Sequence, residues 1–225
     1  MGSQTVFIVF SGILFFFAAV LVYQARKQLR LANMCELATE IKPGEARLYH
    51  GKLVRVAGEA MPVGEEVLTA PISQKACVYW KYEILQRVRR NDKTRTRRIA
   101  AGESKAPFLL RDATGQLWIE PQNVQINDIE PSAVYTFLPE THPIFGGFMR
   151  RRTYANEWNI PLYATIYAIG TVIHHPDGSA YLVPGNTMAA VTMLPFKQFI
   201  RKRRLWGFAM IVGALACIMG GIYLL

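Results

Sequence analysis

Residues 5–23 read TVFIVFSGILFFFAAVLVY, and this stretch decides how the rest of the chain is organised. It contains no charged side chain, and at 1.5 Å rise per residue it is long enough to cross the hydrocarbon core of a bilayer. A second uncharged stretch, LWGFAMIVGALACIMGGIYLL, occupies residues 205–225. We therefore predict a membrane protein with one transmembrane helix near each end and a folded domain between them.

A signal peptide or a pair of buried core helices fits the apolar stretches less well. A cleaved signal peptide normally begins with a basic segment, whereas the first four residues, MGSQ, carry no charged side chain and the basic cluster follows the apolar stretch. Core helices of a small soluble domain would have an amphipathic face, which neither stretch has. The predicted segments are a tail over 1–4, a transmembrane helix over 5–23, a β-rich domain with juxtamembrane helices over 24–204, and a transmembrane helix over 205–225.

Basic residues flank both apolar stretches on their inner sides. They are Arg26, Lys27 and Arg30 after the first stretch, and Lys197, Arg201, Lys202, Arg203 and Arg204 before the second. The positive-inside rule assigns such flanks to the cytoplasm. We expect a bacterial inner-membrane protein with a cytoplasmic central domain and both termini outside. The net charge of +10 also favours an anionic neighbour, of which lipid headgroups are the first candidate.

The pattern of the central domain is mainly that of β-strands. LVRVAGEA at 53–60 alternates, ACVYWKYEILQRV at 76–88 is typical of a long central strand, and the segments 108–121 and 162–185 read as hairpins that turn at Asp112–Gly115 and Pro176–Gly178. Residues 24–41 and 188–204 read as helices, and 128–149 as an irregular, proline-rich segment. The predicted fold class is an α+β membrane protein with two transmembrane helices flanking a mainly β, barrel-like and OB-like domain.

Two strands of this domain resemble each other. LVRVAGEA at 53–60 and IYAIGTV at 166–172 each combine an alternating strand with a glycine, Gly58 or Gly170. A glycine inside a strand permits a bulge or a sharp bend, as in small barrels.

A basic segment follows the long strand and is the main candidate binding site. Its cationic residues are Arg87, Arg89, Arg90, Lys93, Arg95, Arg97 and Arg98, with a turn signal at Asn91–Asp92. Nucleic acid is an unlikely partner, because the segment lacks the interleaved aromatic residues on which bases stack. Contact with anionic lipid or with a protein partner, and a merely solvated hairpin, remain open alternatives.

Small residues recur at every fourth position of the second apolar stretch, namely Ala209, Gly213, Cys217 and Gly221. Such a stripe lets another helix approach closely. The partner would be the first helix, at Gly12, Ala18 and Ala19, or a second copy of the chain.

No pattern in the sequence predicts a catalytic site, a metal site or a cofactor. The adjacent His174 and His175 would point to opposite faces of a strand. Asp112 is expected to cap its own turn and Cys77 to fill a small buried space. Glu157 is expected to pair with a neighbouring arginine in 150–152, or to bind a ligand.

The order of short motifs resembles that of the GIDE family, also called the BAM (beside-a-membrane) domain. These motifs are V-x-V-x-G at 54–58, Thr69-Ala70-Pro71, Cys77-Val78-Tyr79, P-F-x-L-x-D-x-x-G at 107–115, Glu157 in YANEW and the strand glycine Gly170. The resemblance covers nearly the whole chain. The resemblance implies that this chain corresponds to the membrane-flanked region of MULAN-type E3 ubiquitin ligases.

In those ligases a RING module follows the second transmembrane helix and binds zinc through about eight Cys and His ligands. The sequence ends at Leu225 and offers no ligand after Cys217. We therefore expect a prokaryotic relative that works as a non-enzymatic interaction module with a lipid or unknown protein partner. The alternatives are a ligase-like protein and an accessory subunit of a larger membrane complex.

Overall fold

The computed structural model describes residues 2–90, 93–127, 129, 133–135, 153–184 and 189–223. It divides into a helical unit, formed by residues 1–38 and 195–225, and a β unit formed by residues 39–194. Each unit has its own packing.

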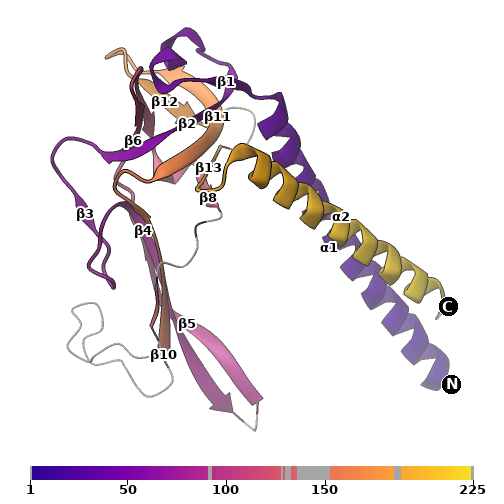
Figure 1. Ribbon diagram of the computed structural model, residues 1–225. Coiled ribbons are helices and arrows are strands. Elements are labelled where there is room, and N and C mark those ends of the chain that lie inside the picture. The colour runs from indigo at the N-terminus through magenta and orange to yellow at the C-terminus, as the bar shows by residue number, and fades with distance from the viewer. Residues whose placement is uncertain are drawn as a thin grey trace. The chain divides into compact units, whose positions relative to one another are not determined.

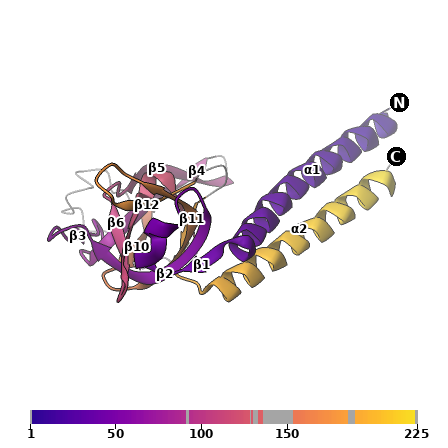
Figure 2. The ribbon, with the colours of Figure 1, turned by 90° about the horizontal axis from the view of Figure 1, so that it is seen from above.

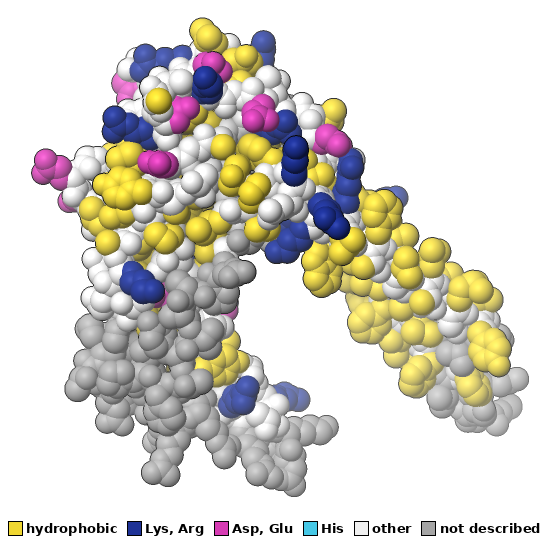
Figure 3. Space-filling model, viewed as in Figure 1, with side chains coloured by type: hydrophobic (Ala, Val, Ile, Leu, Met, Phe, Trp, Pro, Cys, Tyr) yellow, Lys and Arg dark blue, Asp and Glu magenta, His cyan; other side chains and the backbone are white. Residues whose placement is uncertain are grey.

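The helical unit consists of α1 (Gly2–Leu37) and α2 (Phe196–Tyr223). By length and composition, both helices are apolar enough to cross a membrane. They lie side by side in both ribbon views (Figure 1, Figure 2). In the space-filling view most of the visible surface of the pair is hydrophobic (Figure 3). An exposed apolar surface of this kind is what a lipid-facing helix pair requires.

Small side chains line the contact between the two helices. Ser11 donates a hydrogen bond to the carbonyl oxygen of Gly221 at 3.0 Å, and a Cβ atom on Gly207 would lie 2.8 Å from the side chain of Leu29. The buried small residues recur at every seventh position, a spacing typical of a coiled-coil seam. They are Ser11, Ala18, Ala25 and Ala32 on α1 and Gly207, Ala214 and Gly221 on α2.

The predicted small-residue stripe of α2 shares only part of this contact. Gly221 is buried against Phe15, Gly213 and Cys217 are partly buried, and Ala209 is exposed. Of the residues expected to face the stripe, Ala18 is buried in the seam. Packing of the stripe against a second copy stays a prediction.

Polar contacts join the two helices beyond their apolar parts. Arg204 forms an ion pair with Glu36, and Arg203 donates a hydrogen bond to the side-chain oxygen of Gln28 at 2.9 Å. These two residues of the basic flank therefore also stabilise the helix pair. Arg26, Lys27, Arg30, Arg201 and Lys202 have exposed or partly exposed side chains.

Five strands of the β unit close into a barrel. Around it, β2 pairs with β6, β6 with β7, β7 with β12, β12 with β11, and β11 again with β2. Only the pairing of β7 with β12 is parallel. In chain order these are strands 1, 2, 3, 5 and 4, which is the strand order of the OB-fold. The strands are β2 (Leu53–Pro62), β6 (Phe108–Asp112), β7 (Gly115–Ile119), β11 (Thr165–His174) and β12 (Ala180–Val183).

A second sheet is built mainly from the segment between β2 and β6. In it β4 lies centrally and pairs with β3, β5 and β10, and β10 also pairs with β9. Its strands are β3 (Leu68–Thr69), β4 (Ala76–Arg90), β5 (Lys93–Glu103), β9 (Ala133–Tyr135) and β10 (Thr153–Pro161). Short elements at the barrel margin are β1 (Thr39–Ile41), β8 (Gln125–Asn127), β13 (Ala190–Thr192) and two 3₁₀ turns, η1 (Pro43–Leu48) and η2 (Pro121–Asn123).

Alternate residues of each barrel strand point inward and form the core. Fully buried examples from every barrel strand are Val54, Val56, Phe108, Leu110, Leu117, Ile119, Ala168, Val172 and Leu182. The two strands that resemble each other in sequence lie next to each other, with Gly58 opposite Ile166 and Gly170 opposite Val54. Their glycines provide room: a Cβ atom on Gly58 would lie 2.7 Å from the carbonyl oxygen of Arg111, and one on Gly170 would lie 2.9 Å from that of Val183.

The structure confirms the predicted fold class and both hairpins, and it corrects three local predictions. Residues 39–41 form β1 and not the end of a helix, because Ile41 is buried in the barrel core. Residues 190–192 form β13 between β11 and β8, and the helix begins only at Phe196, after Pro195. The pairing of β2 with β11 continues through both glycines without a register shift, so they mark close backbone approach and not a bulge. Met188 and most of 128–149 lie outside the described residues.

The close approach at Gly58 leads to a testable expectation. Gly58→Ala should lower the free energy of unfolding by about 1–3 kcal/mol, because the added methyl group would overlap the β6 backbone. Thermal unfolding of the full chain in detergent, followed by near-ultraviolet circular dichroism, measures this. The neighbouring exposed residue provides a control, since Glu59→Ala should shift the midpoint little; equal midpoints for the two variants would contradict the expectation.

Candidate binding surfaces of the β unit

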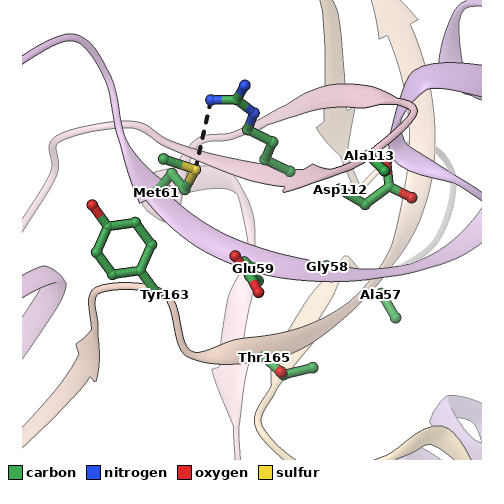
Figure 4. Close-up of a pocket in the computed structure, with 9 residues that line it drawn as sticks. Ala57, Gly58, Glu59, Met61, Asp112, Ala113, Tyr163 and Thr165 are labelled. Carbon is green, nitrogen blue, oxygen red and sulfur yellow. Dashed lines mark hydrogen bonds between the residues drawn. The ribbon is translucent and has the colours of Figure 1, made fainter.

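A groove of about 550 Å³ lies on the outer face of the barrel. Its volume is within the usual range of ligand sites. Three segments form it: β2, the β6–β7 hairpin and the connection from β10 to β11. Figure 4 shows Met61 and Tyr163 at one end and Asp112 and Ala113 at the other, with Glu59 between them. The lining residues are Ala57, Gly58, Glu59, Met61, Arg111, Asp112, Ala113, Tyr163 and Thr165.

Tyr163 is the least expected residue of the groove. It has a φ angle of +60°, in the left-handed region that a bulky side chain rarely adopts, and it is 61% exposed. Its N–H donates to the carbonyl oxygen of Ala60 at 2.8 Å, and the N–H of Ala60 donates to the carbonyl oxygen of Ala164 at 2.9 Å. These bonds hold a backbone conformation that costs roughly 1–3 kcal/mol for a non-glycine residue. A strained and exposed aromatic residue makes this part of the groove a candidate contact site.

A row of apolar and aromatic residues continues from the groove across the outer face of the barrel. Met61 lies opposite Leu109, which is buried, and Leu109 lies opposite the partly buried Trp118 on the next strand. Trp118 stacks on Tyr181 with ring centroids 5.4 Å apart, and Tyr181 in turn lies 4.9 Å from the ring of His175. Ligands of OB-folds bind on the face of strands 2 and 3, which here are β6 and β7. The row therefore lies where this architecture commonly presents a ligand.

One polar contact joins two side chains that line the groove, and it is weak. A guanidinium nitrogen of Arg111 lies 4.0 Å from the sulfur of Met61, which is a weak acceptor. Arg111 is exposed and contributes a cationic donor beside the apolar residues. The groove thus combines an aromatic ring, a thioether and a guanidinium group, a set that suits protein contact.

Asp112 is held within its own turn, as predicted. Its carboxylate accepts hydrogen bonds from the N–H and hydroxyl of Thr114, at 2.8 and 2.6 Å, and from the N–H of Gly115 at 3.2 Å. Desolvation alone would raise the pKa of Asp112, but these bonds and nearby Lys42 bring it below its ordinary value. The group stays ionised at neutral pH and has a structural role.

Cys77 and Glu157 are also buried in the fold and have structural roles. Cys77 is fully buried, as expected, and burial followed by the nearby charge of Glu157 raises its pKa to about 11. Glu157 is fully buried, and its two carboxylate oxygens accept the backbone N–H groups of Ile72 and Ser73 at 2.7 and 2.9 Å. The sequence suggested an arginine partner in 150–152, which lies outside the described residues. No local sequence pattern predicts that Glu157 accepts hydrogen bonds from these two backbone N–H groups.

The histidines are arranged partly as predicted. His174 and His175 contact different neighbours, but His50, which the sequence left isolated, lies 4.7 Å from His174 by ring centroids. An isolated bridge pairs His50 with Val172 and brings these distant residues together. Two imidazoles are too few for a closed zinc site. Among the described residues, no group of three or more His, Cys, Asp or Glu is placed to hold a metal ion.

The basic segment is the β4–β5 hairpin, in which Arg90 lies opposite Lys93. The predicted cationic residues are therefore distributed over two strands. The side chains of Arg87, Arg95, Arg97 and Arg98 are exposed. For Arg89, Arg90 and Lys93 only the backbone is described, and Asn91–Asp92 lie outside the described residues. In Figure 1 the hairpin extends away from the other strands of its sheet.

Comparison with known families gives a match over the C-terminal part of the chain. The GIDE family, described as E3 ubiquitin ligase, matches residues 81–224, which is more than half of the sequence. The matched range runs from within β4 through α2. Comparison with curated proteins found no match, and comparison with solved structures found none either.

The buried carboxylate of Glu157 provides a test of the site's architecture. Glu157→Gln should lower the free energy of unfolding by about 1–3 kcal/mol, because an amide has one acceptor oxygen for the two N–H donors, of which that of Ile72 is buried and that of Ser73 partly buried. Glu83→Gln is the matched control, since Glu83 forms only a partly exposed ion pair with Arg98, worth up to about 1 kcal/mol. Thermal unfolding of both variants checks the difference. A smaller effect of the Glu157 change would refute this role.

Proposed function

Because the chain belongs to the GIDE family, we propose that it is a membrane-anchored, non-enzymatic interaction module that acts beside a membrane surface. In this proposal α1 and α2 anchor the chain, and the barrel presents its outer face to a protein partner. Lipids surround the anchors. Crosslinking from the groove, followed by mass spectrometry, identifies the partner protein.

One observation carries the proposal, namely the groove with the strained, exposed Tyr163. Tyrosine and methionine are common at protein interfaces, because they provide large contact area with little loss of conformational entropy or with adaptable shape. Met61 and Arg111 extend that surface on the neighbouring strands. Backbone strain of this kind persists where the surrounding structure and a function support it.

The reactive groups of the β unit support a non-enzymatic role. A nucleophilic cysteine needs an accessible thiolate, whereas Cys77 is buried and has a raised pKa. The carboxylates of Asp112 and Glu157 each accept hydrogen bonds from backbone N–H groups, which gives both of them a structural role. These groups stabilise the barrel and the segment that lies between β2 and β6.

The family description favours a second function, that of a protein related to E3 ubiquitin ligases. Ubiquitin transfer by a RING depends on bound zinc. Zinc analysis of the purified chain and a reconstituted ubiquitin-transfer assay separate the two functions. Zinc together with transfer would establish the ligase, and the interaction module requires neither.

A third possibility concerns the exposed face of α2. Ala209 is exposed, and Gly213 and Cys217 are partly exposed, so that another helix has room to approach there. A second copy of the chain or a subunit of a larger membrane complex would be the partner. Crosslinking in native membranes, followed by mass spectrometry, distinguishes self-assembly from a larger complex.

We further propose that the β unit is cytoplasmic in a bacterial inner membrane and that both termini lie outside. The basic residues Arg26, Lys27 and Arg30 next to the apolar part of α1, with Arg201 and Lys202 on α2, favour this orientation. Trypsin should therefore digest the β unit in sealed inside-out vesicles and leave it intact in right-side-out vesicles. Detergent should expose it in both, and digestion only in right-side-out vesicles would reverse the assignment.

Tyr163 allows function and stability to be separated. Tyr163→Gly should raise the free energy of unfolding, or leave it unchanged, because glycine adopts a positive φ without strain. The same variant should lose partner contact, measured as a fall of at least about fivefold in crosslinked product, which corresponds to about 1 kcal/mol of binding energy. The measurement uses a photo-reactive residue at Thr165, within the groove.

Gln74→Gly is the matched control for this experiment. Gln74 has a φ angle of +57° but is not among the groove residues, so its replacement relieves the same kind of strain elsewhere. Crosslinking from Thr165 should remain at the level of the unmodified chain. Equal losses for the two variants would indicate a general effect of backbone change, and no loss for Tyr163→Gly would remove the groove from the proposed interface.

A further inference from the structure

Strand alternation sorts the cationic residues of the β4–β5 hairpin onto two faces. Arg87 lies on the same face as Arg98, because Arg98 is paired with Leu85, two residues before Arg87 on β4. Arg95 is paired with Val88 and Arg97 with Gln86, so both occupy the opposite face. The basic residues form one cluster in the sequence, whereas the fold separates them.

The face with Arg87 and Arg98 is compensated within the molecule. The guanidinium of Arg87 lies 5.5 Å from the centre of the Tyr154 ring, and Arg98 forms an ion pair with Glu83 at 3.4 Å. Farther along the same face, Lys81 lies 4.0 Å from Glu103. Cations and acids therefore alternate across this side of the sheet.

The opposite face, here called the Arg95–Arg97 face, combines positive charge with an exposed apolar residue. It consists of Arg95 and Arg97 on β5 with Gln86 and Val88 on β4, and Val88 is 41% exposed. In the described part of the hairpin, the residues of this face include no acid. Among the described strands of this sheet, the acid on the same side is Glu157 of β10, which is fully buried and accepts backbone hydrogen bonds.

We propose that the Arg95–Arg97 face binds anionic lipid headgroups, with Val88 at the boundary of the acyl chains. This inference rests on the proposed membrane-anchored function. A surface that combines arginine with an aliphatic side chain is the chemistry of interfacial membrane binding. Nucleic acid and acidic proteins are less well matched, because β5 offers no aromatic residue for stacking and the anchored domain meets lipid at high effective concentration.

The lengths of the elements and of the segments that connect them bear on this contact. β4 has 15 residues and is about 50 Å long at 3.3 Å per residue. The part of α1 beyond the predicted span, residues 24–37, is about 21 Å long at 1.5 Å per residue. Only Ala38 separates α1 from β1, and three residues separate β13 from α2. These short connections tether the β unit to the helices, so the hairpin would be held at high effective concentration beside any bilayer that the helices span.

The test compares fluorescent probes on the two faces of the same hairpin. Full-length chain with Cys217→Ala receives either Val88→Cys or Thr96→Cys, labelled with an environment-sensitive nitrobenzoxadiazole dye. The natural Cys35 and Cys77 are fully buried and should not react. Thr96 is paired with Arg87 and therefore lies on the compensated face. Each protein is placed in nanodiscs of phosphatidylcholine alone or with about one third phosphatidylglycerol.

In nanodiscs that contain phosphatidylglycerol, the Val88 probe should gain at least about twofold in fluorescence and the Thr96 probe should not. Arg95→Gln with Arg97→Gln should abolish this gain. Each basic residue near an anionic surface changes the bound-to-free ratio about fivefold, so removing two lowers this ratio roughly 25-fold. Arg87→Gln with Arg98→Gln removes the same charge from the compensated face and should preserve the gain.

Three results would overturn the inference: equal responses of both probes, no response of the Val88 probe to phosphatidylglycerol, or equal losses for the two double variants. A response of the Val88 probe to added single-stranded RNA, but not to anionic lipid, would assign the face to nucleic acid instead. Failure of the chain to enter nanodiscs at all would refute the membrane anchor itself. The two proposals are therefore tested by separate observations.

Discussion

The architecture of the β unit depends on the antiparallel pairing of β2 with β11, which closes the barrel. This pairing joins residues that are more than 100 positions apart in the sequence, from Leu53 opposite Thr171 to Glu59 opposite Thr165. β2 also contacts β1 through its first half and β6 through its second half, and Gly58 lies where it changes from one neighbour to the other. The strand crosses the β6 backbone there so closely that no larger side chain would fit. Closure therefore depends on this one strand.

Both candidate surfaces follow from that closure. The groove forms beside Gly58, where β2, the β6–β7 hairpin and the start of β11 converge. The β4–β5 hairpin belongs to the segment that the chain inserts between β2 and β6, so the barrel supports it without needing it for closure. The buried carboxylate of Glu157 links β10 to the segment inserted between β2 and β6, because it accepts the N–H groups of Ile72 and Ser73 between β3 and β4. The strands of the barrel and of the second sheet thus position both candidate surfaces.

Much of this arrangement was predictable from the sequence, because it depends on local patterns. Uninterrupted apolar stretches indicate the two helices, alternation indicates β2, a long run of aromatic and β-branched residues indicates β4, and turn residues such as Asp112 and Gly115 indicate the hairpins. The errors occurred where a distant contact overrides a local preference. Residues 39–41 read as helix, but Ile41 completes the barrel core opposite Val56. Residues 190–192 likewise pair with β11 and β8.

The site was less predictable than the fold, for a related reason. Nothing in the sequence around Tyr163 signals a positive φ angle, since the conformation is imposed by hydrogen bonds with Ala60, about 100 residues away. His50 and His174 meet only through the barrel. The basic segment was recognised by composition, but composition does not reveal which cation has an acidic neighbour.

The separation of charge on the hairpin has a physical cause. A hairpin that extends beyond its sheet has no core to bury its side chains, so both faces remain in contact with water or with another molecule. One face balances its cations with Glu83, Glu103 and the ring of Tyr154, which lowers repulsion at little cost because exposed pairs contribute only about 0–1 kcal/mol. The other face keeps Arg95 and Arg97 beside exposed Val88, an arrangement that folding alone does not favour. In the described part of the hairpin this face has no acid, and the counterpart that we propose for its positive charge is the anionic lipid surface of a membrane that the two apolar helices would span.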